Sequence, residues 1–153
     1  MFIQLLIGAV LIVICVVNHA LFLEVLLRRV KDASPKWELK FPFFGHVFIM
    51  IMVVLGLFLA HTVEAWIWAI FYWIADENES LSEAVYFSTV TFTTLGFGDV
   101  TLSEEWRLTS ALQAVSGILL FGWSTAFLVN VRALHWRKRG MSHIPPHIDK
   151  TED

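Results

Sequence analysis

Residues 93–99 read Thr-Thr-Leu-Gly-Phe-Gly-Asp and lie between two long apolar segments. Backbone carbonyl groups that line a path through a membrane can replace the water shell of a potassium ion. Successive carbonyls can all face one way only if alternate residues adopt unusual dihedral angles, and Gly96 and Gly98 can take a positive φ at little steric cost. Non-helical backbone at membrane depth is tolerated only where protein buries it or a wet path lines it. The sequence therefore predicts a cation-coordinating loop here.

Three apolar segments must position this loop, and each is long enough to cross a bilayer, which takes roughly 20 residues. They run from about Phe2 to Leu27, from Phe43 to Ile74 and from Leu108 to Val131. Of the 153 residues, 57% are apolar and 16% are charged, which excludes an ordinary soluble domain. We expect an all-α membrane protein with three transmembrane helices and a short re-entrant helix before the loop.

Nine of the 11 Lys and Arg residues lie in two regions, and none lies between Ala75 and Trp106. The first region contains Arg28, Arg29, Lys31, Lys36 and Lys40, and the second contains Arg132, Arg137, Lys138 and Arg139. The positive-inside rule places both regions in the cytoplasm, so the N-terminus faces outside and the loop enters from outside. We expect the first region to contact anionic lipid of the plasma membrane.

The segment between the second and third spans is acidic. It carries Asp76, Glu77, Glu79, Glu83, Asp99, Glu104 and Glu105. Acidic groups around an entrance raise the local concentration of cations. Within this segment Ser80-Leu-Ser-Glu83 fits a capping box, which predicts a helix from about Leu81 to Thr93. The C-terminal end of that helix would direct a partial negative charge at the loop.

The stretch from Tyr86 to Asp99 resembles the pore loop of tetrameric potassium channels of the bacterial two-span type. The third span supports the resemblance, because Ala114-Val-Ser-Gly-Ile-Leu-Leu-Phe-Gly-Trp-Ser-Thr-Ala126 is similar to the inner helix of those channels. The resemblance covers about residues 44–135 and leaves the first span as an addition. It implies a selectivity filter that binds K⁺ through carbonyl oxygens and the Thr94 hydroxyl, formed by Thr94, Leu95, Gly96, Phe97 and Gly98.

The resemblance implies further roles around the filter. The cavity below it would be lined by Ile118, Phe121 and Thr125, and the gating hinge would lie at Gly117, with Gly122 completing the Phe-Gly pair. Glycines at these positions could instead serve close helix packing.

Two residues near the filter, Val90 and Phe97, differ from the family pattern, and the first difference affects Asp99. Val90 stands where some bacterial channels carry a Glu that pairs with the filter Asp, so Asp99 needs another partner or water. Phe97 lacks the hydroxyl of a filter Tyr, which predicts a softer filter with faster inactivation or weaker selectivity for potassium over sodium.

The predicted organisation has four parts. They are a transmembrane helix at 1–27, a basic cytoplasmic loop at 28–42, a pore domain at 43–135 and a short cytoplasmic tail at 136–153. The pore domain divides into an outer helix at 43–75, a pore helix at 81–93, the filter at 94–98 and an inner helix at 107–131. Since each chain supplies one loop and a closed filter needs four, we expect a cyclic homotetramer that conducts K⁺ passively, without organic cofactor, catalytic residue or nucleic acid.

Glu64 is an ionisable residue within the second span, which makes it a functional candidate. His61 lies three residues earlier on the same helix face. The two could pair, brace the filter from behind, or lie at the membrane interface, and as a metal site they supply too few ligands. Asn18, His19 and Glu24 in the first span could contact neighbouring helices or, for Glu24, extend to the interface.

Three other functions remain open. Leu95 and Phe97 would suit a weakly selective monovalent cation channel. Gly-x-Gly-Asp also occurs in intramembrane aspartyl proteases, but these need a second carboxylate to share a proton, and no other Asp lies in an apolar segment. The third is a non-conducting membrane subunit.

Overall fold

The computed structural model describes residues 2–40 and 44–141, without the side chains of 33–40, 46 and 134–141. The described residues form four α-helices, α1 Phe2–Lys40, α2 Gly45–Ile74, α3 Leu81–Phe92 and α4 Arg107–Met141. Three of them are long and apolar enough to cross a membrane, over Phe2–Asp32, Val47–Ile74 and Arg107–Ala133. The expected all-α fold with three spans is therefore confirmed.

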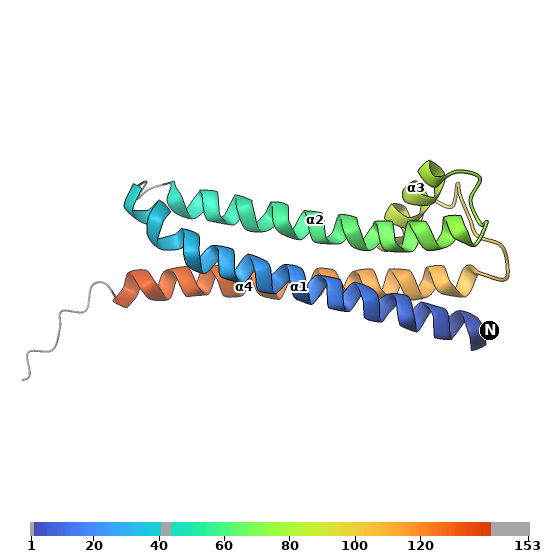
Figure 1. Ribbon diagram of the computed structural model, residues 1–153, viewed down its shortest axis with the longest axis horizontal. Coiled ribbons are helices and arrows are strands. Elements are labelled where there is room, and N and C mark those ends of the chain that lie inside the picture. Colours follow the sequence, from blue (N-terminus) through green and yellow to red (C-terminus); the bar gives the residue numbers. More distant parts are fainter. Residues whose placement is uncertain (1, 41–43, 142–153) are drawn as a thin grey trace, which may run out of the picture.

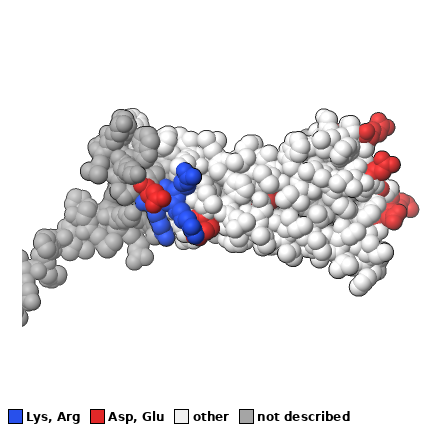
Figure 2. Space-filling view, viewed as in Figure 1, with Lys and Arg blue, Asp and Glu red and all other residues white. Residues whose placement is uncertain are grey.

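The three long helices lie alongside one another, and α3 lies at one end, beside α2 (Figure 1). The N-terminus is at that same end, whereas the end of α1, the start of α2 and the C-terminal part of α4 are at the other. Helix α1 contacts both α2 and α4. Acidic side chains gather at the α3 end, and the Lys and Arg side chains visible in this view lie toward the opposite end, beside a few acidic ones (Figure 2). Arg107, the first residue of α4, lies at the α3 end.

Two helix boundaries differ from the prediction. The basic region expected as a loop over 28–42 is helical as far as Lys40, and the inner helix expected to end at 131 continues to Met141. In α1 the Arg28 guanidinium lies 2.8 Å from the Glu24 carboxylate one turn earlier, and such pairs support helix. Arg and Lys are themselves good helix formers, so positive charge alone did not end the helix. The expected tail beyond Met141 lies outside the described residues.

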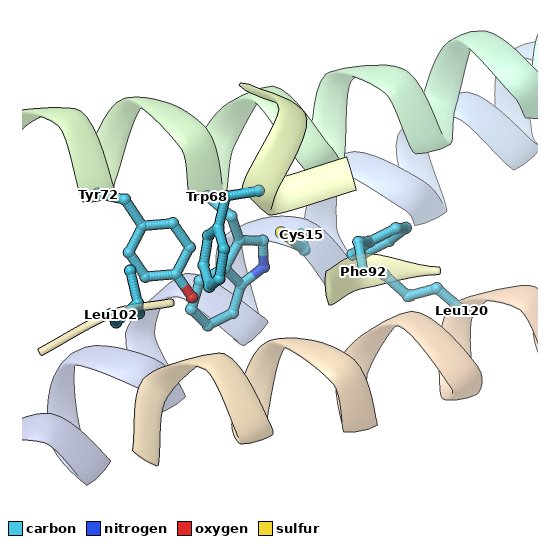
Figure 3. Packing of buried hydrophobic residues seen from close by; sticks show 7 residues of the cluster. Cys15, Trp68, Tyr72, Phe92, Leu102 and Leu120 are labelled. Atoms are coloured by element: carbon cyan, nitrogen blue, oxygen red, sulfur yellow. The ribbon is translucent and has the colours of Figure 1, made fainter. Parts of the chain in front are cut away.

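The helices enclose two apolar clusters. The cluster beneath α3 consists of Cys15, Trp68, Tyr72, Phe87, Phe92, Leu102 and Leu120. The cluster toward the other end consists of Leu23, Leu26, Val30, Ile49, Val53, Leu57 and Val131. Figure 3 shows Trp68 and Tyr72 together in the first cluster, with Phe92 and Leu120 at its far side. Residues from all four helices thus fix α3 on the bundle.

Candidate functional site: a carbonyl loop behind a short helix

Helix α3 begins as the sequence predicts. The Ser80 hydroxyl accepts a hydrogen bond from the Glu83 amide at 3.2 Å, which satisfies one of the free N–H groups of the first turn. The Glu83 carboxylate accepts from the amide of Glu79 at 2.8 Å, one residue earlier than a standard capping box requires. The helix therefore starts at Leu81, and it ends at Phe92 with Thr93 as C-cap.

A buried polar chain fixes α3 between α2 and α4. The Ser88 hydroxyl donates to the Ala65 carbonyl at 2.6 Å, and the Gln113 side-chain amide donates to the Ser88 hydroxyl at 2.7 Å. The Tyr72 hydroxyl donates to the Gln113 side-chain oxygen at 3.0 Å. Gln113, Ser88 and Tyr72 are all buried, so their polar groups depend on one another. This set was not predicted from the sequence. A Gln within an apolar span was the feature that could have indicated a buried polar contact here.

The loop after α3 alternates its backbone conformation. Thr94, Gly96 and Gly98 have φ of 60°, 57° and 77°, respectively. The positive φ predicted for the two glycines is confirmed. Thr94 is a β-branched residue, for which a positive φ is sterically costly. This alternation is the condition under which successive carbonyls can face one way.

The amides of the loop are bonded back to α3. The Leu95 and Gly96 amides donate to the Val90 carbonyl at 3.0 and 3.3 Å, and the Thr94 amide donates to the Thr91 carbonyl at 2.9 Å. Val90 thus supports the loop through its backbone. Within the described chain no backbone hydrogen bond ends on the carbonyl oxygens of residues 94–97. Those oxygens are available to a ligand.

Asp99 has a protein partner that the sequence did not reveal. The Tyr86 hydroxyl donates to the Asp99 carboxylate at 2.6 Å. This hydrogen bond lowers the pKa of the Asp99 carboxyl and raises the pKa of Tyr86, because it favours the ionised acid and the neutral phenol. The group bonded to Asp99 is therefore a phenol and not the second carboxylate that a protease would require.

Several expected filter and cavity residues are exposed in the single chain. Leu95 and Phe97 expose 59% and 64% of their surface, and Ile118 exposes 60%. The Thr125 hydroxyl donates to the Phe121 carbonyl within its own helix. The ring of Phe121 is half-buried, at 4.4 Å from the His61 ring and 5.5 Å from the Phe92 ring, centre to centre, and its place at the cavity stays a prediction. It packs against α2 and α3.

The two glycines of α4 have different surroundings. A side chain at Gly117 would collide with the backbone carbonyl of Phe92, at the end of α3, whereas nothing lies within 4 Å of a side chain at Gly122. Gly117 therefore permits close packing of α4 on α3. The hinge role of both glycines stays a prediction.

Glu64 lies in a polar cluster formed by residues of α1, α2 and α4. Its carboxylate oxygens are 2.9 Å from the Nδ1 atoms of His19 and His61, and the Asn18 amide is 3.3 Å away. The predicted pairing with His61 is confirmed, and the expected contacts of Asn18 and His19 with a neighbouring helix are made to Glu64. Glu64 itself is bonded to α1, and the link from this cluster to α3 runs through the His61 ring, 6.0 Å from that of Phe92.

The comparisons agree with this arrangement. A family model described as "Ion channel" matches residues 49–132, which is more than half of the chain and includes α3, the loop and most of α2 and α4. No curated protein and no solved structure matches the chain significantly. Helix α1 lies wholly outside the matched residues.

Proposed function

The chain belongs to the ion channel family, and on that premise we propose that it is the pore-forming subunit of a potassium-selective channel. The observation that carries the proposal is the alternating positive φ at Thr94, Gly96 and Gly98. With the amides bonded to α3, the carbonyls of residues 94–97 are left for an ion. Rings of such carbonyls replace the hydration shell of K⁺ and allow ions to pass by knock-on between adjacent sites.

A homotetramer would supply the further loops that a closed filter needs. One chain provides a single loop, and a closed ring of carbonyls requires four loops around one axis. The exposed side chains of Leu95, Phe97 and Ile118 fit this assembly, since they belong to residues that would face neighbouring chains or the pore axis. Cross-linking of the detergent-solubilised protein should give a ladder that ends at four chains. A ladder that ends at two would contradict the assembly.

The charge distribution supports one orientation in a multi-pass membrane protein. Acidic side chains gather at the α3 end, and Arg28, Arg29, Lys31 and Arg132 lie toward the other end (Figure 2). We place the α3 end outside the plasma membrane and the basic end in the cytoplasm. Arg28, Arg29 and Lys31, with Lys36 and Lys40 farther along the chain, would then contact anionic lipid headgroups. Channel activity that is equal in neutral and anionic lipid would contradict this contact.

Weaker selectivity is the second candidate. Phe97 has no hydroxyl with which to bond the protein behind the filter, so one brace of a tyrosine filter is missing. A filter with fewer constraints can admit Na⁺ if selectivity depends on holding the carbonyls in place. This candidate predicts the same pore with a lower ratio of K⁺ to Na⁺ flux.

Ion flux from liposomes that contain the purified protein tests the proposal. We expect K⁺ flux that exceeds Na⁺ flux, that Ba²⁺ blocks, and that Gly96→Ala abolishes, because a side chain is strained at a φ of 57°. Equal K⁺ and Na⁺ fluxes that Gly96→Ala also abolishes would favour the weakly selective channel. Flux that Gly96→Ala leaves unchanged would overturn the filter assignment.

A further inference from the structure

Glu64 is a carboxylate with no exposed surface in the middle of a membrane-spanning helix. An isolated carboxylate in such surroundings is very costly unless a positive charge compensates it. The described residues that touch its oxygens are His19, His61 and Asn18, and none of these is permanently charged. This burial is tolerated when Glu64 is itself protonated, when a histidine partner carries a positive charge, or when a cation is bound.

The cluster offers three metal ligands. His19 is contributed by α1, whereas His61 and Glu64 come from α2. Their ligand atoms all lie within 4.8 Å of one another. Two imidazoles and one carboxylate form a ligand set that Zn²⁺ uses with a fourth position left for water. The sequence indicated only two ligands, because nothing in it places His19 beside Glu64.

The distances are compatible with a tetrahedral ion. Bonds of about 2.0–2.1 Å at tetrahedral angles would separate two ligand atoms by about 3.3 Å. Each carboxylate oxygen now lies 2.9 Å from one Nδ1 atom. Each carboxylate oxygen is thus closer to its Nδ1 partner than a metal-bound pair would be, so the carboxylate and the imidazoles must move apart to admit the ion. A hydroxide at the fourth position would leave the site without net charge.

Ser124 on α4 lies within hydrogen-bonding distance of both imidazole rings that would bind such an ion. Its hydroxyl oxygen is 2.9 Å from Nε2 of His61 and 3.3 Å from Nε2 of His19. With a metal on both Nδ1 atoms, both Nε2–H groups can donate to this oxygen, which has two acceptor sites. With two neutral imidazoles that donate from Nδ1 to Glu64, the single Ser124 proton can satisfy only one of the two Nε2 acceptors. The metal-bound state thus pairs both rings.

A pocket gives access to the cluster. His61 exposes 13% of its side chain and lines a pocket of about 360 Å³ between α2, α3 and α4, together with Thr62, Thr89, Phe92 and Phe121. An ion could reach His61 first from this pocket. His19 and Glu64, which are fully buried, would then complete the site behind it.

We propose that His19, His61 and Glu64 bind a divalent metal ion of the Zn²⁺ class, with Ser124 holding both imidazole rings. The ion joins α1 to α2 and, through Ser124, to α4. The added first helix is thereby fastened to the helices of the pore. This site does not depend on which ion the pore conducts, so its test uses binding and not flux.

Zinc binding to the full-length protein in detergent tests the proposal. After treatment with a chelator, the protein is dialysed against Zn²⁺ and its metal content is measured by elemental analysis. We expect one Zn²⁺ per chain, with affinity reduced at least about tenfold in His19→Gln, His61→Gln and Glu64→Gln. Ser124→Ala keeps all three ligands and should weaken binding by about tenfold, as the loss of an outer partner does.

Two controls separate this site from other histidines. The double variant His143→Gln/His147→Gln removes the imidazoles of the tail and should bind zinc as the wild type does. Co²⁺ added to the wild type should give the intense visible absorption of a tetrahedral ion, and His19→Gln should lose it even if Glu64→Gln fails to fold. No zinc in the wild type, unchanged binding in the His19 and His61 variants, or binding lost only in the tail variant would overturn the proposal.

Discussion

The carbonyl oxygen of Phe92 lies directly against the backbone of Gly117, so the C-terminal end of α3 rests on α4 at a point where no side chain fits. Two residues after Phe92 the chain enters the carbonyl loop. The close approach of the end of α3 to α4, just before this loop, therefore requires that residue 117 have no side chain. This contact makes the glycine important for packing, whatever it also contributes to bending.

Gly117→Ala should destabilise the protein by about 1–3 kcal/mol, because the added methyl group overpacks a contact with rigid backbone. It should also reduce ion flux by displacing the end of α3. Gly122→Ala is the matched control, since nothing lies within 4 Å of its added carbon. Thermal unfolding in detergent measures the difference. Equal midpoints for the two variants would show that Gly117 has no special packing role.

Tyr86→Phe should make the pore more sensitive to external acid. The Tyr86 hydrogen bond lowers the pKa of Asp99, so the carboxylate stays ionised to lower pH when the hydroxyl is present. Without it the pKa of Asp99 rises, and loss of its charge occurs at a higher pH. Ion flux measured against external pH should therefore fall at a higher pH than in the wild type.

Asp99→Asn provides the control for that prediction, because an amide does not titrate in this range. Its flux should lack the acid-dependent step that Tyr86→Phe shifts. If the wild type and Tyr86→Phe give superimposable pH profiles, the hydrogen bond at 2.6 Å has no influence on the charge at the entrance.

Gln113→Leu should break the buried polar chain behind α3. It leaves the Ser88 hydroxyl without its donor and the Tyr72 hydroxyl without its acceptor. Each buried group left unpaired costs about 1–3 kcal/mol. Ser110→Ala, whose hydroxyl donates only to its own helix at Arg107, should change stability little. Comparable losses of unfolding free energy in both variants would argue against a specific role for Gln113.

Phe97→Tyr should stiffen the filter. A hydroxyl at this position can bond to protein behind the loop, as it does in tyrosine filters of the family that the sequence resembles. We expect a higher ratio of K⁺ to Na⁺ permeability and slower inactivation. Current recordings of both variants in the same lipid measure these properties, and unchanged values would show that the missing hydroxyl does not soften this filter.

The local features of the fold could be predicted well. The start of α3 at Leu81 follows from the Ser80 cap, and the positive φ of Gly96 and Gly98 follows from the Gly-x-Gly spacing. The three spans follow from the apolar runs. Each of these depends on interactions between residues that are near in sequence, or on composition alone.

Contacts between distant residues could not be predicted. Tyr86 meets Asp99 only because the loop turns back along α3, and His19 meets Glu64 only because α1 packs on α2. Likewise, the contacts of the Phe121 ring with His61 and Phe92 depend on the packing of α4 against α2 and α3. A single sequence carries no signal for such pairings, since any polar residue in a span could have found another partner.

The reversal potential of the purified protein in a planar bilayer, with K⁺ on one side and Na⁺ on the other, tests the central claim most directly. A carbonyl filter at residues 94–98 predicts a reversal potential far from zero, with the sign that opposes the movement of K⁺ out of the K⁺ side. It also predicts no current in Gly96→Ala. A potential near zero with the same sensitivity to Gly96→Ala would contradict potassium selectivity. Current that persists in Gly96→Ala would contradict the filter itself.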